Sequence, residues 1–210
     1  ELALNGTASH AFSHILYKAL LFMSMGAVLF RTGTCEASKL GGLFKSMPWT
    51  AGFCIVGAMS ISAFPLFSGF VSKSMILTAA AEEHRWVIWS MLLIASAGVM
   101  EHSGIKIPYF AFFAHDGGHR VKEAPKNMLW AMGIAAFLCI GIGVYPDALY
   151  ATLPYEVNYH PYTFGHVITS LQLLVFAGLA FLFLIKTGLY PAEMPSTNLD
   201  FDWVYRRFLP

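Results

Sequence analysis

The chain carries little charge. Only 12% of its 210 residues are Asp, Glu, Lys or Arg, whereas 57% are hydrophobic. An average soluble domain carries about 25% charged residues, and a soluble globule of this size could not cover so apolar a chain with polar surface. Intrinsic disorder is also excluded, because it needs low hydrophobicity and high charge. The composition therefore indicates an integral membrane protein.

The sequence also lacks the patterns that hold cofactors, metals or nucleic acid. Its three cysteines, Cys35, Cys54 and Cys139, form no CxxC pair, so they are interpreted as small apolar residues and not as a zinc site or disulfide framework. No glycine-rich nucleotide loop, haem-attachment motif or GxSxG elbow is present. An HDxxH pattern at His115–His119 lies in a short loop and is a weak metal signal. With 13 basic against 12 acidic residues, nothing indicates nucleic-acid binding. We expect no cofactor and no metal.

Long apolar runs dominate the chain instead. The hydrocarbon core of a bilayer is about 30 Å thick and needs roughly 20 apolar residues per helix. The runs are continuous and do not alternate with polar residues, which argues against a β-barrel. The expected fold is therefore all-α: a polytopic membrane protein with about five transmembrane helices over residues 1–187, followed by a cytoplasmic or interfacial tail at 188–210. The spans are expected at residues 11–30, 47–81, 86–113, 127–145 and 166–185.

The apolar region 47–81 could cross the membrane twice as two short helices, or once as a broken helix. Lys and Arg favour cytoplasmic loops, so the flanking segments decide between these alternatives. Segments 31–46 and 114–126 each carry three Lys or Arg, whereas the loop 146–165 carries none. One crossing puts both cationic segments on the same side, and two crossings would force one of them outside. We therefore predict a single, discontinuous crossing broken within 63–69, with the N-terminus outside and the C-terminus in the cytoplasm.

Pro65 and Gly69 are the reason to expect the break. Proline removes a backbone donor, and glycine frees the backbone further. The released carbonyls and amides cannot face lipid, so they must be buried in protein or line a hydrated cavity. Transporters place ion sites at such breaks. A simple proline kink without function is the alternative.

Charged side chains at bilayer depth cost about 2.5–3.5 kcal/mol each on insertion scales and therefore mark candidate functional sites. His10, His14 and Lys18 follow one another at a spacing of four residues, which places them on one face of a helix. Because imidazole titrates near neutral pH and a desolvated lysine can lose its proton, the three residues form a candidate proton relay. Alternatively, the two histidines lie near the outer surface and only Lys18 is buried.

Lys73, Glu101 and Lys106 are the other charges expected inside the spans. Lys73 lies four residues after Gly69, and about 15 Å of helix separates it from the next loop. We therefore predict a site near the middle of the bilayer and not a side chain that reaches the interface. Glu101 is expected to be buried and to need a cationic partner, for which His102, Lys106 or Lys73 could serve. Lys106 is also close enough to the inner end of its span to reach the interface.

Several of these residues belong to an ordered set of motifs, His10-x3-His14-x3-Lys18-Ala19-Leu20-Leu21-Phe22, Gly41-Gly42-Leu43, Ser62-Ala63-Phe64-Pro65 and Gly69-Phe70-x2-Lys73. As a set they resemble the proton-translocating antiporter-like family. That family includes the three large membrane-arm subunits of respiratory complex I and the large subunits of Mrp-type multisubunit cation/proton antiporters. A later set looks most like the D-type subunit of the Mrp-type branch: Gly104–Pro108, His115-Asp116 and Asn198–Trp203.

The resemblance implies roles for individual residues. In this family about 14 helices form two inverted repeats, each with a broken helix, and protons pass along buried lysines, histidines and a glutamate. Lys18 with His10 and His14 matches the family's histidine-rich lysine helix, and Lys73 matches the residue on the second broken helix. Nothing here corresponds to the glutamate–lysine pair of the first repeat, so the chain resembles only the C-terminal part of such a subunit. Glu101 matches no firm family motif, and neither does Lys106; both rest on the burial argument.

The resemblance therefore implies a subunit of a multisubunit monovalent cation (Na⁺/K⁺):proton antiporter in a bacterial inner membrane. Such a subunit is a secondary transporter and not an enzyme, and its partners are the other subunits, the lipid bilayer, protons and monovalent cations. Two alternatives stay open. In the membrane arm of an NADH:quinone oxidoreductase or a membrane-bound hydrogenase, redox energy would drive the same helix chemistry. A structural assembly subunit would conduct nothing, but a scaffold has no reason to carry buried lysines.

Overall fold

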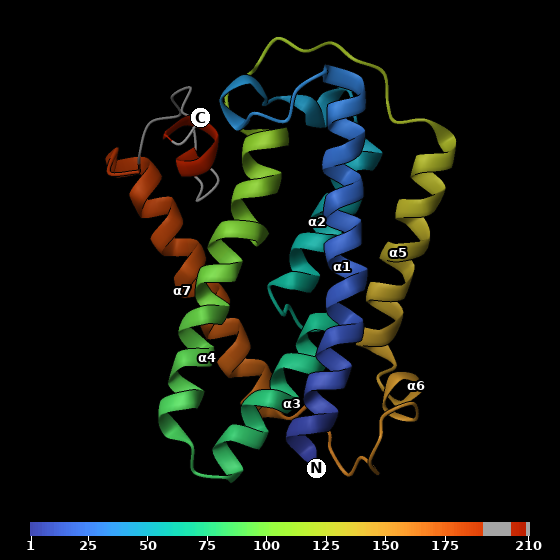
Figure 1. Cartoon of the computed structure of the whole chain (residues 1–210), viewed down its shortest axis with the longest axis vertical. Coiled ribbons are helices and arrows are strands. Elements are labelled where there is room, and N and C mark those ends of the chain that lie inside the picture. Colours follow the sequence, from blue (N-terminus) through green and yellow to red (C-terminus); the bar gives the residue numbers. More distant parts are fainter. Residues whose placement is uncertain (191–202, 209–210) are drawn as a thin grey trace.

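The computed structural model describes residues 1–190 and 203–208, and every regular element in that part of the chain is helical (Figure 1). The expected tail at 188–210 and the Asn198–Trp203 motif lie largely outside these described residues. The elements, in chain order, are α1 (Leu2–Thr32), the 3₁₀ turns η1 (Ala37–Lys39) and η2 (Leu43–Lys45), α2 (Pro48–Ile61), α3 (Ser68–Glu82), α4 (Trp86–Val99), the π-helical η3 (Met100–Lys106) and η4 (Tyr109–Phe113), α5 (Lys126–Val144), α6 (Asp147–Tyr150), α7 (Phe164–Thr187) and the π-helical η5 (Val204–Phe208).

Helix α1 is the longest element and runs the full height of the bundle (Figure 1). It ends at Gly33, which adopts a positive φ of 77° and donates its N–H to the carbonyl of Leu29. It begins nine residues before the expected start at residue 11, because one face of its first turns, with Asn5, Gly6 and Ser9, is buried within the chain. Asn5 is buried and exchanges side-chain hydrogen bonds with the backbone of Tyr155. Hydropathy alone gives no signal for such a polar extension.

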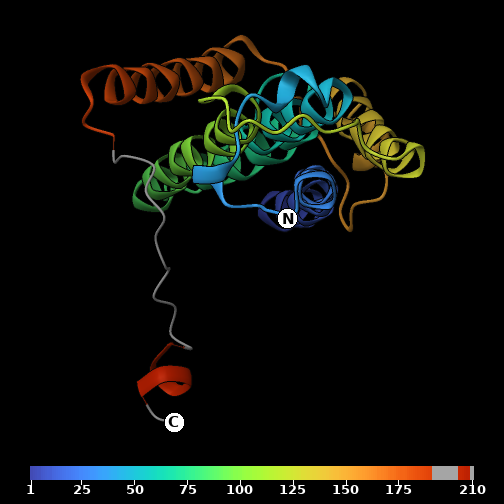
Figure 2. The same ribbon diagram turned by 90° about the horizontal axis from the view of Figure 1, so that it is seen from above.

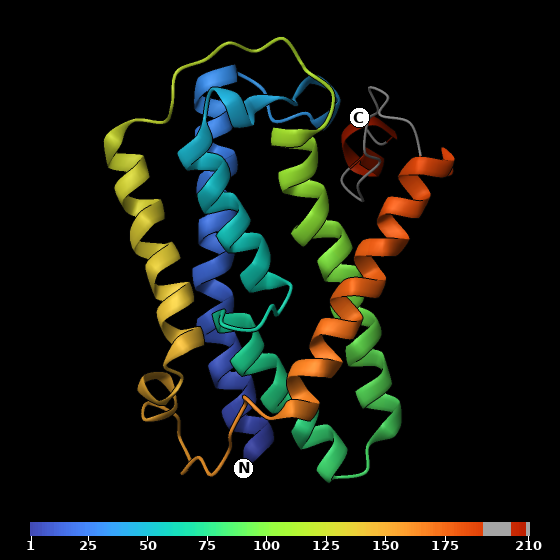
Figure 3. The same ribbon diagram turned by 180° about the vertical axis from the view of Figure 1, so that it is seen from behind.

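Four helical segments among the described residues are long and apolar enough to cross a membrane: Leu2–Thr32, Trp86–Phe113, Lys126–Val144 and Phe164–Thr187. Helices α2 and α3 have 14 and 15 residues, so each is only about 21–23 Å long and too short to cross alone. They follow one another along α1 and together cover its height once (Figures 1 and 3). The predicted all-α membrane fold with one discontinuous helix is confirmed.

The break between the two half-helices comprises residues 62–67, slightly earlier than the expected 63–69. Ser68 and Gly69 are already helical. Within the break, Ala63 and Leu66 adopt positive φ values of 61° and 75°, which are uncommon for residues with a Cβ. Gly69 is required by close packing and not by flexibility, because a Cβ there would collide with the carbonyl oxygen of Ser60.

The loops sort into two ends of the bundle. Segments 31–46 and 114–126 meet at one end, where Arg31 donates two hydrogen bonds to the carbonyl of Glu123 and the Gly117 N–H reaches the Gly41 carbonyl. The turn at 82–85 and the loop at 146–163 lie at the opposite end, beside the N-terminus (Figures 1 and 3). Seen from above, α1 and α7 lie on opposite sides of α2, α3 and α4 (Figure 2).

Candidate functional site

Lys73 binds the broken end of α2. Its Nζ atom donates to the carbonyl of Ile61 at 2.7 Å and approaches Ser96 Oγ of α4 at 3.4 Å. Ile61 is the last residue of α2, so its carbonyl has no helical partner and lies at the negative end of the helix dipole. The break thus creates an acceptor, and α3 supplies the cation that occupies it.

The other polar groups of the break are bound by neutral partners. The Ala63 carbonyl accepts from Ser170 Oγ of α7 at 2.8 Å, and the Phe64 N–H donates to the Met59 carbonyl at 3.0 Å. Among the described hydrogen bonds of the break, the one from Lys73 therefore has a charged donor. This arrangement satisfies the requirement that backbone released inside a membrane be bound within the protein.

His10 of α1 contacts Ser72, the residue that precedes Lys73 in α3. Its Nδ1 atom is 3.2 Å from Ser72 Oγ. The Ser72 hydroxyl lies within donating distance of the Ser68 and Gly69 carbonyls, so it accepts from an Nδ1–H of His10. His10 and Lys73 both line a cavity of about 230 Å³ between α1, α3 and α4. The structure thus brings together two residues that the sequence analysis placed in one relay.

The other two residues of the expected series, His14 and Lys18, do not line this cavity. The rings of His10 and His14 are 5.8 Å apart, which is consistent with one helix face. Lys18, however, lies on an exposed face of α1, and so does His14. The burial expected for Lys18 is therefore not supplied by the described residues, because α1 packs inward through its serine, tyrosine and leucine face and turns Lys18 outward.

The two charges expected in the third span, Glu101 and Lys106, lie apart from the break. Glu101 is half-buried, but within the described part of the chain it forms no ion pair with His102, Lys106 or Lys73. Lys106 instead lies 5.4 Å from the ring centre of Tyr190. Both residues stand in the π-helical η3, which is wider than an α-helix and was not expected.

This π-helical segment packs against the break. A Cβ at Gly104 of η3 would collide with the Ser62 hydroxyl, so the absence of a side chain there lets the two irregular segments approach closely. Single π turns inside α-helices are frequent at functional sites. No periodicity in the sequence distinguishes a π turn from an α turn, which is why it was missed.

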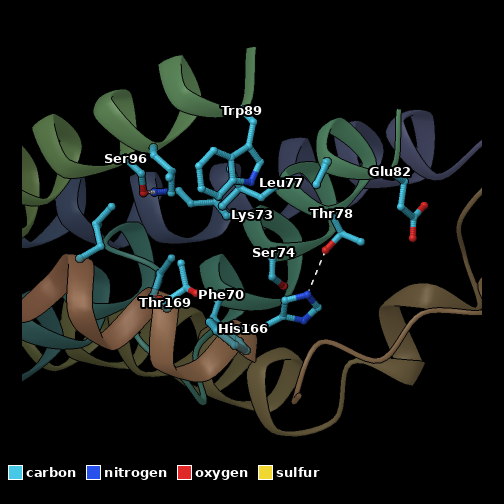
Figure 4. A pocket seen from close by; sticks show the side chains of 15 residues that line it. Phe70, Lys73, Ser74, Leu77, Thr78, Glu82, Trp89, Ser96, His166 and Thr169 are labelled. Atoms are coloured by element: carbon cyan, nitrogen blue, oxygen red, sulfur yellow. Dashed lines mark hydrogen bonds between the residues drawn. The ribbon is translucent and has the colours of Figure 1, made fainter. Parts of the chain in front are cut away.

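A second cavity, of about 240 Å³, opens on the other side of Lys73 between α3, α4 and α7. Lys73 and Ser96 lie toward one end of it, and Thr78, Glu82 and His166 toward the other (Figure 4). His166 Nε2 is 3.1 Å from Thr78 Oγ1. The sequence analysis placed His166 only at the edge of a span; its proximity to Thr78 depends on how α7 folds back, 88 residues later, and no local motif signals it.

The opposite end of α2 is held by a carboxylate. Glu123 accepts hydrogen bonds from the Trp49 N–H at 2.8 Å, the Thr50 N–H at 3.4 Å and the Thr50 hydroxyl at 2.6 Å. It also accepts from the Ala124 N–H at 2.8 Å. A carboxylate at a helix N-terminus satisfies free N–H groups and the positive end of the dipole. This cap was also missed, because it comes from a residue 73 positions later in the chain.

Comparison with known proteins assigns this arrangement to a family. Residues 1–98, which contain α1, the broken pair and most of α4, match the family described as "NADH:quinone oxidoreductase/Mrp antiporter, TM". The chain belongs to this family. The resemblance expected from the motifs is thereby confirmed at the level of the family, and the chain is a multi-pass membrane protein.

The individual relatives include both a hydrogenase component and an antiporter subunit. Hydrogenase-4 component B of Escherichia coli strain K12 is 32% identical over 155 residues, covering 68% of this chain and 23% of the relative. The D-type Na(+)/H(+) antiporter subunit of Alkalihalophilus pseudofirmus is 34% identical over 113 residues, covering 54% and 23%. A chain of the archaeal membrane-bound sulfane sulfur reductase has a similar structure, with a TM-score of 0.70 and 25% identity over 95% of this chain and 34% of that one. The chain thus spans about a quarter of the length of the curated relatives it matches.

Proposed function

We propose that this chain is part of the proton-translocating subunit of a multisubunit monovalent cation/proton antiporter. The observation that carries the proposal is the bond between Lys73 and the Ile61 carbonyl at the break, with a cavity on either side of the lysine. A cation that joins two cavities at the middle of a span is placed to accept a proton from one and release it to the other. Membership of the family supports this role.

The proposed path runs along α1 into the break. Lys18 and His14 take up protons on the exposed face of α1, and His10, held by Ser72, passes them to Lys73 across the cavity that both line. Charge on one member disfavours charge on its neighbour, because like charges a few ångströms apart repel. A proton arriving at His10 therefore promotes release from Lys73. Glu101 and Lys106 are proposed as an extension of this path within η3.

The surroundings proposed for the complex follow from the loops and the relatives. The cationic segments 31–46 and 114–126 share one end of the bundle, and we propose that this end faces the cytoplasm. The membrane is proposed to be a bacterial inner membrane, and the transported ions are protons and a monovalent cation such as Na⁺ or K⁺. The other subunits of the complex are the proposed partners, because the relatives are named as components or subunits of larger assemblies.

A second candidate function is favoured by two of the relatives. Hydrogenase-4 component B and the sulfane sulfur reductase chain are both named as parts of redox complexes. In such a complex the same lysine path would move protons, but electron transfer and not a cation gradient would drive it. The helix chemistry is common to both candidates, so the driving reaction has to be tested directly.

The test uses inverted membrane vesicles from cells that produce the complete complex. A pH gradient is established, and its collapse is followed by fluorescence after addition of Na⁺ or K⁺. The proposal expects cation-dependent collapse that Lys73→Ala abolishes, while Lys122→Ala, at an exposed loop lysine, leaves it unchanged. Wild-type transport in the Lys73→Ala complex would overturn the proposed path. Proton movement that needs a redox donor and ignores Na⁺ and K⁺ would establish the second candidate.

A further inference from the structure

The cavity beside Lys73 ends close to a second hollow, at the end of the bundle that carries the 146–163 loop. The cavity is lined by His166 at that end. The hollow, of about 410 Å³, is lined by residues 147–160 of the loop, including Asp147, Glu156 and Tyr159. His166 and Tyr159 are hydrogen-bonded at 3.4 Å, so this pair forms the partition between the two spaces.

The hydrogen bonds of His166 define which nitrogen carries its proton. Nδ1 is 3.2 Å from the Pro161 carbonyl, and a carbonyl can only accept, so Nδ1 carries the hydrogen in the neutral ring. Nε2 is then an acceptor and is bound by the Thr78 hydroxyl at 3.1 Å. The unprotonated nitrogen thus faces the Lys73 cavity, and the protonated nitrogen faces the loop (Figure 4).

We propose that His166, together with Thr78 and Tyr159, relays protons between the Lys73 cavity and the hollow in the 146–163 loop. This inference rests on the proposed function of Lys73. A proton from cavity water binds Nε2 and forms an imidazolium, and the hydrogen on Nδ1 then leaves for the loop side. One proton enters and one leaves, and no bond between heavy atoms changes. This leaves the ring as the Nε2–H tautomer. Rotation of the ring then exchanges the sides that the two nitrogens face, and a second proton taken up at Nδ1 and released from Nε2 restores the starting tautomer.

The lining of the cavity suits water between Lys73 and His166. Hydroxyl groups of α3, α4 and α7 face it, from Ser74, Thr78, Ser96, Thr169 and Ser170. A buried water needs two to four polar partners. A cavity of about 240 Å³ has room for several, and these hydroxyls offer partners in a lining that is otherwise mostly apolar. In the proposal, water bound by these hydroxyls connects Lys73 with His166.

Three other titratable groups face His166 or share its cavity: Tyr159 from the loop, and Lys73 and Glu82 from α3. Burial raises the pKa of Tyr159, so its hydroxyl keeps its proton and acts as both donor and acceptor. Glu82 is exposed at the outer end of α3 and offers a competing route from the cavity to the surface. The two routes make different predictions for variants of His166 and Glu82.

The experiment measures cation-dependent collapse of a pH gradient in the same vesicles. His166→Ala removes the imidazole, and His166→Gln keeps a hydrogen-bond donor and acceptor that cannot be protonated. We expect both to slow transport at least ~10-fold, since a positioned proton-transfer group contributes about 10²–10⁴-fold. Added imidazole is expected to restore the Ala variant. His84→Ala, at an exposed histidine of the 82–85 turn that lines neither space, is the control and should transport at the wild-type rate.

The outcomes separate this inference from the proposed function. Slowed transport in both His166 variants, with assembled complex and rescue by imidazole, supports the relay. A wild-type rate in either variant, or an Ala variant that imidazole does not restore, overturns it. Loss of transport in Glu82→Gln with intact His166 variants assigns the path to Glu82. An active Lys73→Ala complex would instead overturn the proposed function itself.

Discussion

The two ends of α2 are each bound by a charged side chain from elsewhere in the chain, and the contrast between them separates a structural cap from a site that can change its charge. At the N-terminal end, Glu123 accepts four hydrogen bonds from α2 and its own neighbour. At the C-terminal end, Lys73 donates one short bond to the Ile61 carbonyl and a longer one to Ser96. Both charges match the sign of the helix dipole.

The difference lies in what else surrounds each charge. The four donors around Glu123 leave its carboxylate fully used, so removal of the carboxylate would leave the Trp49, Thr50 and Ala124 N–H groups without their acceptor. Lys73 lines two cavities, and in the proposed path it exchanges its proton there. Electrostatic complementarity to a helix end is therefore not itself a mark of function, and the two cavities are what distinguish Lys73 from Glu123 in the proposal.

The largest effect is expected from Lys73→Arg. Guanidinium fits the negative end of α2 but stays protonated at any accessible pH, so it should keep the cap and lose the relay. We expect cation-dependent proton transport to fall at least ~10-fold while the amount of assembled complex stays near wild type. Transport rates in vesicles and native gel electrophoresis measure the two properties. An arginine variant with wild-type transport would make Lys73 a second structural cap like Glu123.

Packing at the broken end gives the next largest effect. In Gly69→Ala the new methyl group would collide with the Ser60 carbonyl, and overpacking of this kind costs about 1–3 kcal/mol. Gly52→Ala is the matched control, since a Cβ at Gly52 of α2 meets open space and alanine favours a helix. We expect a lower midpoint of thermal unfolding for the first variant only. Equal midpoints would show that the break can widen without cost.

A smaller, purely structural effect is expected at the other end. Glu123→Ala removes the cap of α2, and the loss of a helix cap costs about 1–2 kcal/mol. The thermal unfolding midpoint should fall, and protease should cut the 114–126 loop faster. Transport per assembled complex should remain near wild type. A selective loss of transport with normal stability would mean that Glu123 also belongs to the proton path.

The smallest effect is expected from an exposed pair in the same loop. Arg120 binds Asp116 at 2.7 Å and holds the pKa of that carboxyl well below its usual range. A carboxyl whose pKa is depressed in the folded state stabilises the fold at pH values above its unfolded-state pKa, which is about 3.9 for Asp. This stabilisation is lost as the pH falls below that value. Asp116→Asn should therefore shift the unfolding midpoint slightly and equally across pH 5–9. A difference from wild type that changes within this range would contradict the assignment.

The sequence was sufficient for the features that depend on local composition. Apolar length predicted the spanning helices, and Pro65 with the sequence around it predicted the break to within one or two residues. The placement of Lys73 beside the released backbone followed from its spacing to Gly69. These features are local because hydropathy, proline geometry and helical rise each act over a few residues.

The features that were missed depend on contacts between distant segments. Glu123 reaches α2 across 73 residues and His166 reaches Thr78 across 88, and neither sequence position shows a motif. The sequence left the partner of Glu101 open, because an expected burial does not say which side chain lies opposite. The face on which Lys18 lies was predicted from its spacing, but whether that face is covered depends on packing.

The bond between Ile61 and Lys73 also has a mechanical consequence. It ties the two half-helices together across the gap, and a hydrogen bond to a charged donor is roughly twice as strong as a neutral one. Loss of the lysine's proton would weaken this tie, and we expect the crossing to become more flexible around residues 62–67. Faster amide hydrogen exchange over residues 62–67 in Lys73→Met than in Lys73→Arg would reveal this softening. Release of a proton from the lysine would then increase the flexibility of both α2 and α3, in addition to changing the electrostatic potential in the cavities.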